Sequence, residues 1–240
     1  MQRSPGWPIR SLHGTIKQHF FRFRSRPIEE YRTRLYLISP PEINLNAFEE
    51  AAKAALSGGD VACFQLRLKD QPADVIREAT ERLMPLFQEH DVAFLINDDP
   101  KLARELGTDG VHVGQDDTPY KEARAIVGDN AIVGVTCHNS RHLAMTAAEN
   151  GADYVAFGAF YPTTTKETKF KAEPELLTWW SSLAETPCLA IGGITVDNAE
   201  PLIKSGADFL AISSGIWNHP DGPEAAVRDL NRVIDNTIAS

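Results

Sequence analysis

Short apolar runs alternate with helix-length segments from residue 35 onward, and this alternation occurs eight times. Each run is hydrophobic at nearly every position, which is typical of strands that are buried on both faces of a parallel sheet. The expected strands are residues 35–39, 63–68, 93–98, 110–114, 132–137, 154–160, 188–193 and 209–214. Helix starts are indicated between them at Asp99, at Thr118, and at Asn139 or Ser140, because these residue types cap helix N-termini.

Eight such units predict an α/β protein built as a single (β/α)8 TIM barrel, for which a span of roughly 200 residues is at the lower size limit. A doubly wound open sheet is the alternative. A short internal echo supports one continuous array, since Gly151-Ala152-Asp153 and Gly206-Ala207-Asp208 each lead from a helix end into a strand, and Gly107-Thr108-Asp109 resembles them. We interpret the echo as structural, because glycine suits the left-handed conformation that ends many helices.

Charge divides the chain near residue 34. Residues 1–34 contain 8 Lys and Arg against 2 Asp and Glu, whereas residues 35–240 contain 16 against 31. We therefore expect a basic, disordered N-terminal extension, residues 1–34, and a barrel domain, residues 35–240. The extension is also Arg-rich and poor in acidic residues, as transit-like leaders are, and an over-long start of the reading frame is a further alternative. The acidic barrel argues against a nucleic-acid partner, because phosphate neutralisation dominates such binding.

The composition of the 240-residue chain, with 42% hydrophobic and 24% charged residues, is that of an ordinary globular protein. The longest apolar runs are far shorter than the roughly 20 residues that cross a bilayer, so no membrane partner is expected. Cys63, Cys137 and Cys188 each lie in an apolar run and lack metal-ligand spacing. They predict reduced core thiols in a cytoplasmic protein.

Polar residues gather where the expected strands end, which is where (β/α)8 barrels place their chemistry. In the second run, alternation puts Gln65, Arg67 and Lys69 on one side, which faces inward if the register is right. Two cations and an amide at a barrel mouth suit a multiply charged oxyanion. The alternative is that the two cations neutralise nearby carboxylates.

Carboxylates follow the third and fourth strands, in Asp98-Asp99 and Asp116-Asp117. Neighbouring parallel strands lie about 4.8 Å apart, so these loops could share a hard cation such as Mg²⁺. Helix capping by Asp99 and support of a cap by Asp117 are the competing interpretation.

Hydroxyl and glycine residues follow the sixth to eighth strands. Residues 161–166 hold three threonines and a lysine, Gly192 and Gly193 end the seventh run, and Ser213 and Ser214 end the eighth. Barrels commonly bind phosphate through backbone N–H groups in these last loops. Together with the carboxylates, they predict two anion sites, one with a metal and one without.

Five ordered motifs carry a resemblance that covers residues 35 to 236. They are QLRLK at 65–69, LIND at 95–98, DGVHVGQDD at 109–117, YPTTTK at 161–166 and AIGGI at 190–194. In these residues the chain resembles the thiamine phosphate synthase family. The resemblance implies a (β/α)8 transferase with Mg²⁺ as cofactor. Its partners would be two phosphorylated small molecules, 4-amino-5-hydroxymethyl-2-methylpyrimidine diphosphate and 4-methyl-5-(2-phosphoethyl)thiazole, which it would join to thiamine phosphate with release of pyrophosphate.

The resemblance also implies roles for individual residues. Asp98 and Asp117 would be the Mg²⁺ ligands. Arg67, Lys69 and Lys166 would be catalytic, because cations stabilise the charge that develops on departing pyrophosphate. The pyrimidine diphosphate would be held by Gln65, Arg67, Lys69, Asn97, Thr136 and Lys166. The thiazole phosphate would be bound by Thr163, Thr165, Gly193, Ile212 and Ser213.

The chain departs from the family pattern at a few positions. Asp99 stands where the family usually has Arg, and it adds negative charge beside the expected metal. Ala159 replaces a usual Pro, Thr136 replaces Ser, and Ser214-Gly215 replaces an apolar pair.

Two alternative functions remain open from the sequence. A thiazole tautomerase of the same fold would use His138 as its acid or base, since imidazole titrates near neutral pH. A non-catalytic sensor of phosphorylated metabolites would bind without turnover.

His112, inside a strand, is expected to be a hydrogen-bonded core residue. A homo-oligomer is possible, but nothing in the sequence fixes its size.

Overall fold

The computed structural model describes residues 32–163 and 170–239. Eight parallel strands form a closed barrel in the order β1 to β8, and β8 pairs with β1. The strands are β1 (Arg34–Ile38), β2 (Cys63–Leu66), β3 (Ala93–Asn97), β4 (Gly110–Val113), β5 (Ile132–His138), β6 (Tyr154–Phe157), β7 (Cys188–Ile191) and β8 (Phe209–Ile212). The predicted (β/α)8 barrel is confirmed, and the open-sheet alternative is wrong because the sheet has no edges.

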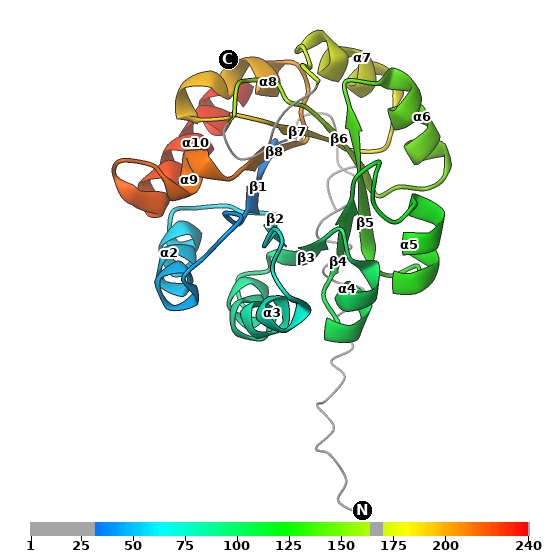
Figure 1. Cartoon of the computed structure of the whole chain (residues 1–240). Coiled ribbons are helices and arrows are strands. Elements are labelled where there is room, and N and C mark those ends of the chain that lie inside the picture. Colours follow the sequence, from blue (N-terminus) through cyan, green and yellow to red (C-terminus); the bar gives the residue numbers. More distant parts are fainter. Residues whose placement is uncertain (1–31, 164–169, 240) are drawn as a thin grey trace, which may run out of the picture.

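Helices surround the strands as an outer ring (Figure 1). They are α2 (Leu45–Ser57), α3 (Ala73–Gln88), α4 (Pro100–Leu106), α5 (Tyr120–Val127), α6 (Arg141–Glu149), α7 (Glu175–Leu183), α8 (Glu200–Lys204), α9 (Ser214–Trp217) and α10 (Gly222–Ile238), with a 3-10 turn, η2, at Val196–Asn198. Asp99 and Ser140 accept backbone hydrogen bonds as N-caps of α4 and α6, as predicted. Thr118 does not cap α5, which starts at Tyr120 after Pro119.

Apolar side chains pack in two separate layers. The outer layer joins the strands to the helices, for example Leu35 and Phe64 against Phe48 and Leu83. The inner layer fills the barrel and includes Tyr36, Leu95, Ile132, Tyr154 and Leu189. Successive residues of a strand point to opposite sides, so a strand that serves both layers is hydrophobic throughout.

The internal echo has one structural role at the amino ends of the strands, which we call the barrel floor. Asp109, Asp153 and Asp208 each accept a hydrogen bond from a backbone N–H of the preceding strand, those of Phe94, Val133 and Cys188, at 2.7 to 2.8 Å. Each of these aspartates precedes its own strand, so its carboxylate joins two neighbouring strands. The structural interpretation of the echo is confirmed.

The first described residues are also bound to the floor. Strand β1 begins at Arg34, one residue before the expected boundary of the barrel, and Arg34 forms an ion pair with Asp60 at 2.5 Å. Arg32 contacts Asp60 at 3.2 Å and Asp235 of α10 at 2.7 Å. The barrel therefore engages the chain from residue 32, and the expectation of a disordered extension falls on residues 1–31, which lie outside the described residues.

The cysteines of the three apolar runs, Cys63, Cys137 and Cys188, are buried free thiols, as predicted. In the described part of the chain, every helix is too short or too polar to span a membrane.

Candidate active site

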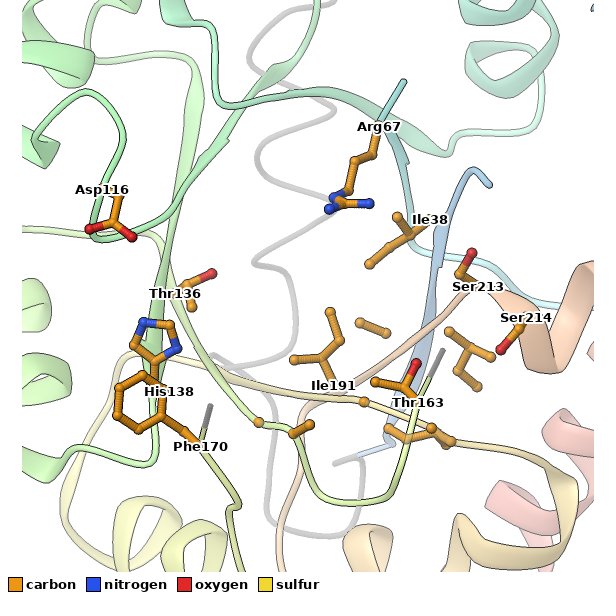
Figure 2. A pocket seen from close by; sticks show the side chains of 17 residues that line it. Ile38, Arg67, Asp116, Thr136, His138, Thr163, Phe170, Ile191, Ser213 and Ser214 are labelled. Atoms are coloured by element: carbon orange, nitrogen blue, oxygen red, sulfur yellow. The ribbon is translucent and has the colours of Figure 1, made fainter. Parts of the chain in front are cut away.

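A cavity of about 270 Å³ opens at the carboxyl ends of the strands (Figure 2). One side carries Arg67, whose guanidinium points toward the centre of the cavity, together with Ser213 and Thr163. The opposite side carries Thr136 and His138. The wall between them is apolar and includes Ile38, Ile191, Ala211, Ile212 and Ile194. The cavity thus combines an apolar chamber with polar groups at its two sides, as small-molecule sites commonly do.

The expected site residues fall into three groups. Those that line the cavity are Arg67, Thr136, Thr163, Gly193, Ile212 and Ser213. Those that lie elsewhere at the carboxyl ends of β2, β3 and β4 are Gln65, Lys69, Asn97, Asp98 and Asp117. Thr165 and Lys166 lie outside the described residues, so their expected roles stay predictions.

Arg67 is placed by the end of β1. Its backbone N–H donates to the hydroxyl of the fully buried Ser39 at 2.8 Å. The next residue expected on the same side, Lys69, is exposed instead. Strand β2 ends at Leu66, and the N–H of Lys69 bonds to the carbonyl of Pro41 at 3.0 Å, so the strand alternation does not continue to Lys69.

Asp98 and Asp117 face each other beside Arg67. Asp98 follows β3 with a φ of 64°, and its N–H donates to the carbonyl of His112 at 2.8 Å. Asp117 is held by the N–H of Gly114, which donates to its Oδ2 at 2.8 Å. Burial is the largest cause that raises the pKa of Asp98 to about 6, the Asp117 carboxylate adds to the increase, and the Arg67 guanidinium opposes it.

The two close carboxylates suit a divalent cation, but they provide only part of its ligands. Among residues 32–163 and 170–239, no group of three or more His, Cys, Asp or Glu side chains is arranged to hold a metal. Mg²⁺ commonly binds one or two carboxylates and completes its shell with water and substrate phosphates. Asp98 and Asp117 therefore fit a Mg²⁺ ion that arrives with a phosphorylated ligand better than a metal fixed by protein ligands alone.

Asp99 turns away from this pair. Its Oδ1 accepts hydrogen bonds from the N–H groups of Lys101 at 3.0 Å and Leu102 at 2.9 Å, in the first turn of α4. The competing capping interpretation is thus confirmed for Asp99. At the position where the family usually has Arg, this chain has the residue that caps the N-terminus of α4.

The loops after β6 and β7 are joined closely at the cavity wall. The N–H of Tyr161 donates to the carbonyl of Gly192 at 3.1 Å. Gly193 has a φ of 62°, and a Cβ atom there would overlap the carbonyl oxygen of Pro162. A glycine is therefore needed at this position both for its conformation and for the close approach of the two loops.

Several cavity residues were missed at the sequence level. Asp116 lines the cavity, whereas the adjacent Asp117 does not, although both follow β4. Phe170 lines it too, and its ring lies 4.5 Å from that of His138. The alternation of β1 places Ile38 on the same inner side as Tyr36 and could have indicated Ile38. Nothing in the pattern of a loop could have indicated Phe170.

His112 is a buried histidine with two ring hydrogen bonds. Its Nδ1 lies 2.8 Å from the hydroxyl of Tyr154 and its Nε2 lies 2.7 Å from the hydroxyl of Thr136. The expectation of a hydrogen-bonded core residue is confirmed.

Known proteins resemble this chain over most of its length. The TMP-TENI family, described as thiamine monophosphate synthase, matches residues 35–216. A thiamine-phosphate synthase from Rhodospirillum centenum is 64% identical over 201 residues, which are 84% of this chain and 97% of the relative. One from Hyphomonas neptunium is 57% identical over 210 residues, 85% of this chain and 95% of the relative. Among solved structures, thiamine phosphate pyrophosphorylase from Pyrococcus furiosus has a TM-score of 0.76 at 29% identity, and the match covers 86% of this chain and 98% of that one.

Proposed function

The chain belongs to the thiamine monophosphate synthase family, and from that premise we propose that it is a Mg²⁺-dependent thiamine-phosphate synthase. Such a transferase joins 4-amino-5-hydroxymethyl-2-methylpyrimidine diphosphate to 4-methyl-5-(2-phosphoethyl)thiazole and releases pyrophosphate. The observation that carries the metal dependence is the opposed pair of Asp98 and Asp117 beside Arg67. The Asp117 carboxylate helps to raise the pKa of Asp98, and a bound divalent cation would relieve the repulsion between the two.

Asp98 and Asp117 would hold the Mg²⁺ through their carboxylates, with the diphosphate oxygens as further ligands. When bound, the ion supplies positive charge that stabilises the departing pyrophosphate. Gly114 orients Asp117 through its N–H, which donates to Oδ2, and Asp117 in turn contacts Asp98.

The reaction breaks the bond between the pyrimidinylmethyl carbon and the diphosphate oxygen, and it forms a bond between that carbon and the thiazole nitrogen. Arg67, Lys69 and Lys166 would be the cations that stabilise negative charge on the leaving group. Arg67 has the best structural support, because its guanidinium points into the cavity and its backbone is anchored by Ser39. The chain's main contribution is alignment of the two reactants and stabilisation of the leaving group, without a side-chain nucleophile.

The remaining subsites follow from the two sides of the cavity. Gln65, Asn97 and Thr136 would hold the pyrimidine diphosphate. The thiazole phosphate would bind among Thr163, Thr165, Gly193, Ile212 and Ser213. Ser213 donates its hydroxyl hydrogen to the carbonyl of Ser39 at 3.3 Å, so its oxygen can still accept a hydrogen bond from a ligand. The apolar wall between the two subsites would exclude water from the electron-deficient carbon.

Two alternatives compete with this proposal. His138 lines the cavity, as a tautomerase would require. The two relatives reported above are both thiamine-phosphate synthases, and a tautomerase has no need for the carboxylate pair beside Arg67. A non-catalytic sensor would bind the same ligands without forming product.

A coupling assay tests the proposal directly. The purified full chain is incubated with both phosphorylated substrates, with Mg²⁺ or with EDTA, and thiamine phosphate and pyrophosphate are measured. We expect equal amounts of both products, formed only with the metal. Binding of both substrates by folded protein without any product would overturn the synthase and favour the sensor. Proton exchange on the ring of the thiazole substrate without any coupling would favour the tautomerase.

A further inference from the structure

A continuous chain of hydrogen bonds crosses the interior of the barrel beneath the cavity. Its six side chains come from six different strands, and consecutive polar atoms lie 2.6 to 2.9 Å apart. In order across the barrel they are Thr136, His112, Tyr154, Tyr36, Gln65 and Asn97. The two ends belong to the candidate site, since Thr136 lines the cavity and Asn97 directly precedes Asp98. We call this set the interior chain.

The middle of the interior chain is sealed from solvent. Tyr36 and Tyr154 are both 0% exposed, and their rings pack edge to face with centroids 5.9 Å apart. Space for the ring of Tyr154 is provided by Gly134 of β5, because a Cβ atom at that position would overlap the ring. A buried polar group without a hydrogen-bond partner destabilises the fold. Each hydrogen bond of the interior chain therefore needs one donor hydrogen and one acceptor.

The donor capacities fix the direction of the hydrogen bonds from Gln65 to His112. The carbonyl oxygen of Gln65 can only accept, so the hydroxyl of Tyr36 donates to it at 2.9 Å. Tyr36 has then used its hydrogen and must accept from Tyr154. Tyr154 in turn must accept from Nδ1 of His112, which therefore carries a hydrogen. In a neutral ring Nε2 then has no hydrogen and accepts from the hydroxyl of Thr136.

This direction determines what the two ends of the interior chain offer to a ligand. The hydrogen of Thr136 is turned away from the cavity, so its oxygen can act only as an acceptor there. At the other end, Nε2 of Gln65 donates to Oδ1 of Asn97 at 2.6 Å. The amide nitrogen of Asn97 then donates to the carboxyl group of Asp98, so this end of the interior chain meets the expected metal site.

We propose that His112, Tyr154 and Tyr36 are positioning residues, which hold the Thr136 hydroxyl as an obligate acceptor for an amino group of the ligand. The proposal rests on the proposed function, in which the pyrimidine substrate carries one amino group. It extends that function by giving a positioning role to three buried residues that would not contact the ligand. Removal of the Tyr154 hydroxyl separates the two halves, because Tyr36 can still donate to Gln65.

The first test reads the direction of the interior chain in the free protein. The full chain is labelled with ¹⁵N-histidine, and the His112 signals are assigned by their loss in His112→Asn. We expect a neutral ring with the hydrogen on Nδ1, and in Tyr154→Phe a population with the hydrogen on Nε2. Tyr120→Phe is the matched control, since it also removes a hydroxyl with two hydrogen bonds, one donated to the carbonyl of Gly151 and one accepted from Nε of Arg124, on the outside of the barrel. It should leave the His112 signals unchanged. A wild-type ring with a hydrogen on Nε2, whether neutral or doubly protonated, would overturn the proposal.

The second test uses calorimetric binding in the presence of Mg²⁺, which needs no turnover. Tyr154→Phe should weaken binding of the aminopyrimidine diphosphate about five- to tenfold, as expected for one net hydrogen bond, and should leave the affinity for pyrophosphate within about twofold. In a Thr136→Val background, the same change should have no further effect. Equal weakening of both ligands, or full additivity with Thr136→Val, would show a merely structural role and overturn the proposal.

The two tests separate this inference from the proposed function. If His112 has the expected tautomer and Tyr154→Phe shows the expected binding pattern, but no coupled product forms, only the synthase proposal is overturned. Coupled product together with an unchanged affinity in Tyr154→Phe would overturn only the positioning role.

Discussion

Aspartates stand at both ends of the barrel, but their surroundings differ. At the floor, Asp109, Asp153 and Asp208 bond to backbone N–H groups of neighbouring strands, and Asp153 also pairs with Arg124. At the mouth, Asp98 and Asp117 face each other.

The comparison shows how one residue type performs two tasks. A carboxylate that is fully engaged by backbone donors stabilises the fold and has little capacity left for a ligand. A carboxylate beside another carboxylate destabilises the ligand-free protein and gains from a bound cation. The four predictions below test this contrast, and the largest effect comes first.

Removal of a mouth carboxylate should abolish turnover and spare the fold. We expect Asp98→Ala and Asp117→Ala each to lower kcat/KM about a thousandfold or more, because they remove a ligand of an ion that stabilises the leaving group. Their melting temperatures should stay within a few degrees of that of the wild type, as measured by circular dichroism. Undiminished activity in either purified variant would exclude that residue from the metal site.

Removal of a floor carboxylate should have the reverse effect. Asp153→Ala leaves the N–H of Val133 and the Arg124 guanidinium without their shared acceptor, and we expect a loss of about 2 to 4 kcal/mol in the free energy of unfolding. Urea unfolding measures the loss, and kcat/KM below the transition should remain within about twofold. Asp153→Asn, which keeps one acceptor oxygen, should lose less. A stable Asp153→Ala protein without activity would contradict the contrast.

A feature of this fold is predictable from the sequence when neighbouring residues determine it, and unpredictable when distant parts of the chain determine it. The strands were predictable because both faces of every strand are buried, which makes each one an unbroken apolar run. Their ends were placed one to three residues too late in most cases, because the polar residues that follow leave the sheet to form the mouth. Alternation correctly predicted the direction of Arg67, one residue beyond the end of β2, but it failed at Lys69, three residues beyond that end.

The interior chain could not be predicted from local pattern. Tyr36 and Tyr154 each look like ordinary members of apolar runs, and their hydroxyls meet only because the barrel closes and joins residues 118 positions apart. The roles of Asp99 and Asp117 were ambiguous for a related reason, since capping and metal binding use the same residue type at the same place after a strand.

Binding of Mg²⁺ should depend on pH through Asp98. Its pKa is raised to about 6, chiefly by burial and then by Asp117, so a proton competes with the metal below that pH. We expect the apparent Mg²⁺ affinity to fall by up to about tenfold per pH unit below 6 and to level off above it. Without metal, the contribution of Asp98 to stability is fully present below about pH 4, and it is lost as the pH rises through 6.

Thermal shift measurements with and without Mg²⁺ at pH 5 and pH 7.5 test this expectation. The metal should raise the melting temperature more at pH 7.5. Asp98→Asn is the control, because it should remove both the metal effect and its pH dependence. An equal Mg²⁺ effect at the two pH values would argue against Asp98 as a ligand.

The smallest effect is expected at Asp99, which lies at the mouth but is bonded like a floor aspartate. Its Oδ1 accepts from the N–H groups of Lys101 and Leu102, so its charge is directed to the α4 N-terminus. Asn caps helices about as well as Asp, so Asp99→Asn should change the free energy of unfolding by less than about 0.5 kcal/mol, and kcat/KM by less than twofold. Asp99→Arg restores the usual family residue but loses the cap, at a cost of about 1 kcal/mol. A tenfold change in Mg²⁺ affinity in Asp99→Asn would show instead that its charge belongs to the metal site, and the contrast between bonded and opposed aspartates would then fail at the mouth.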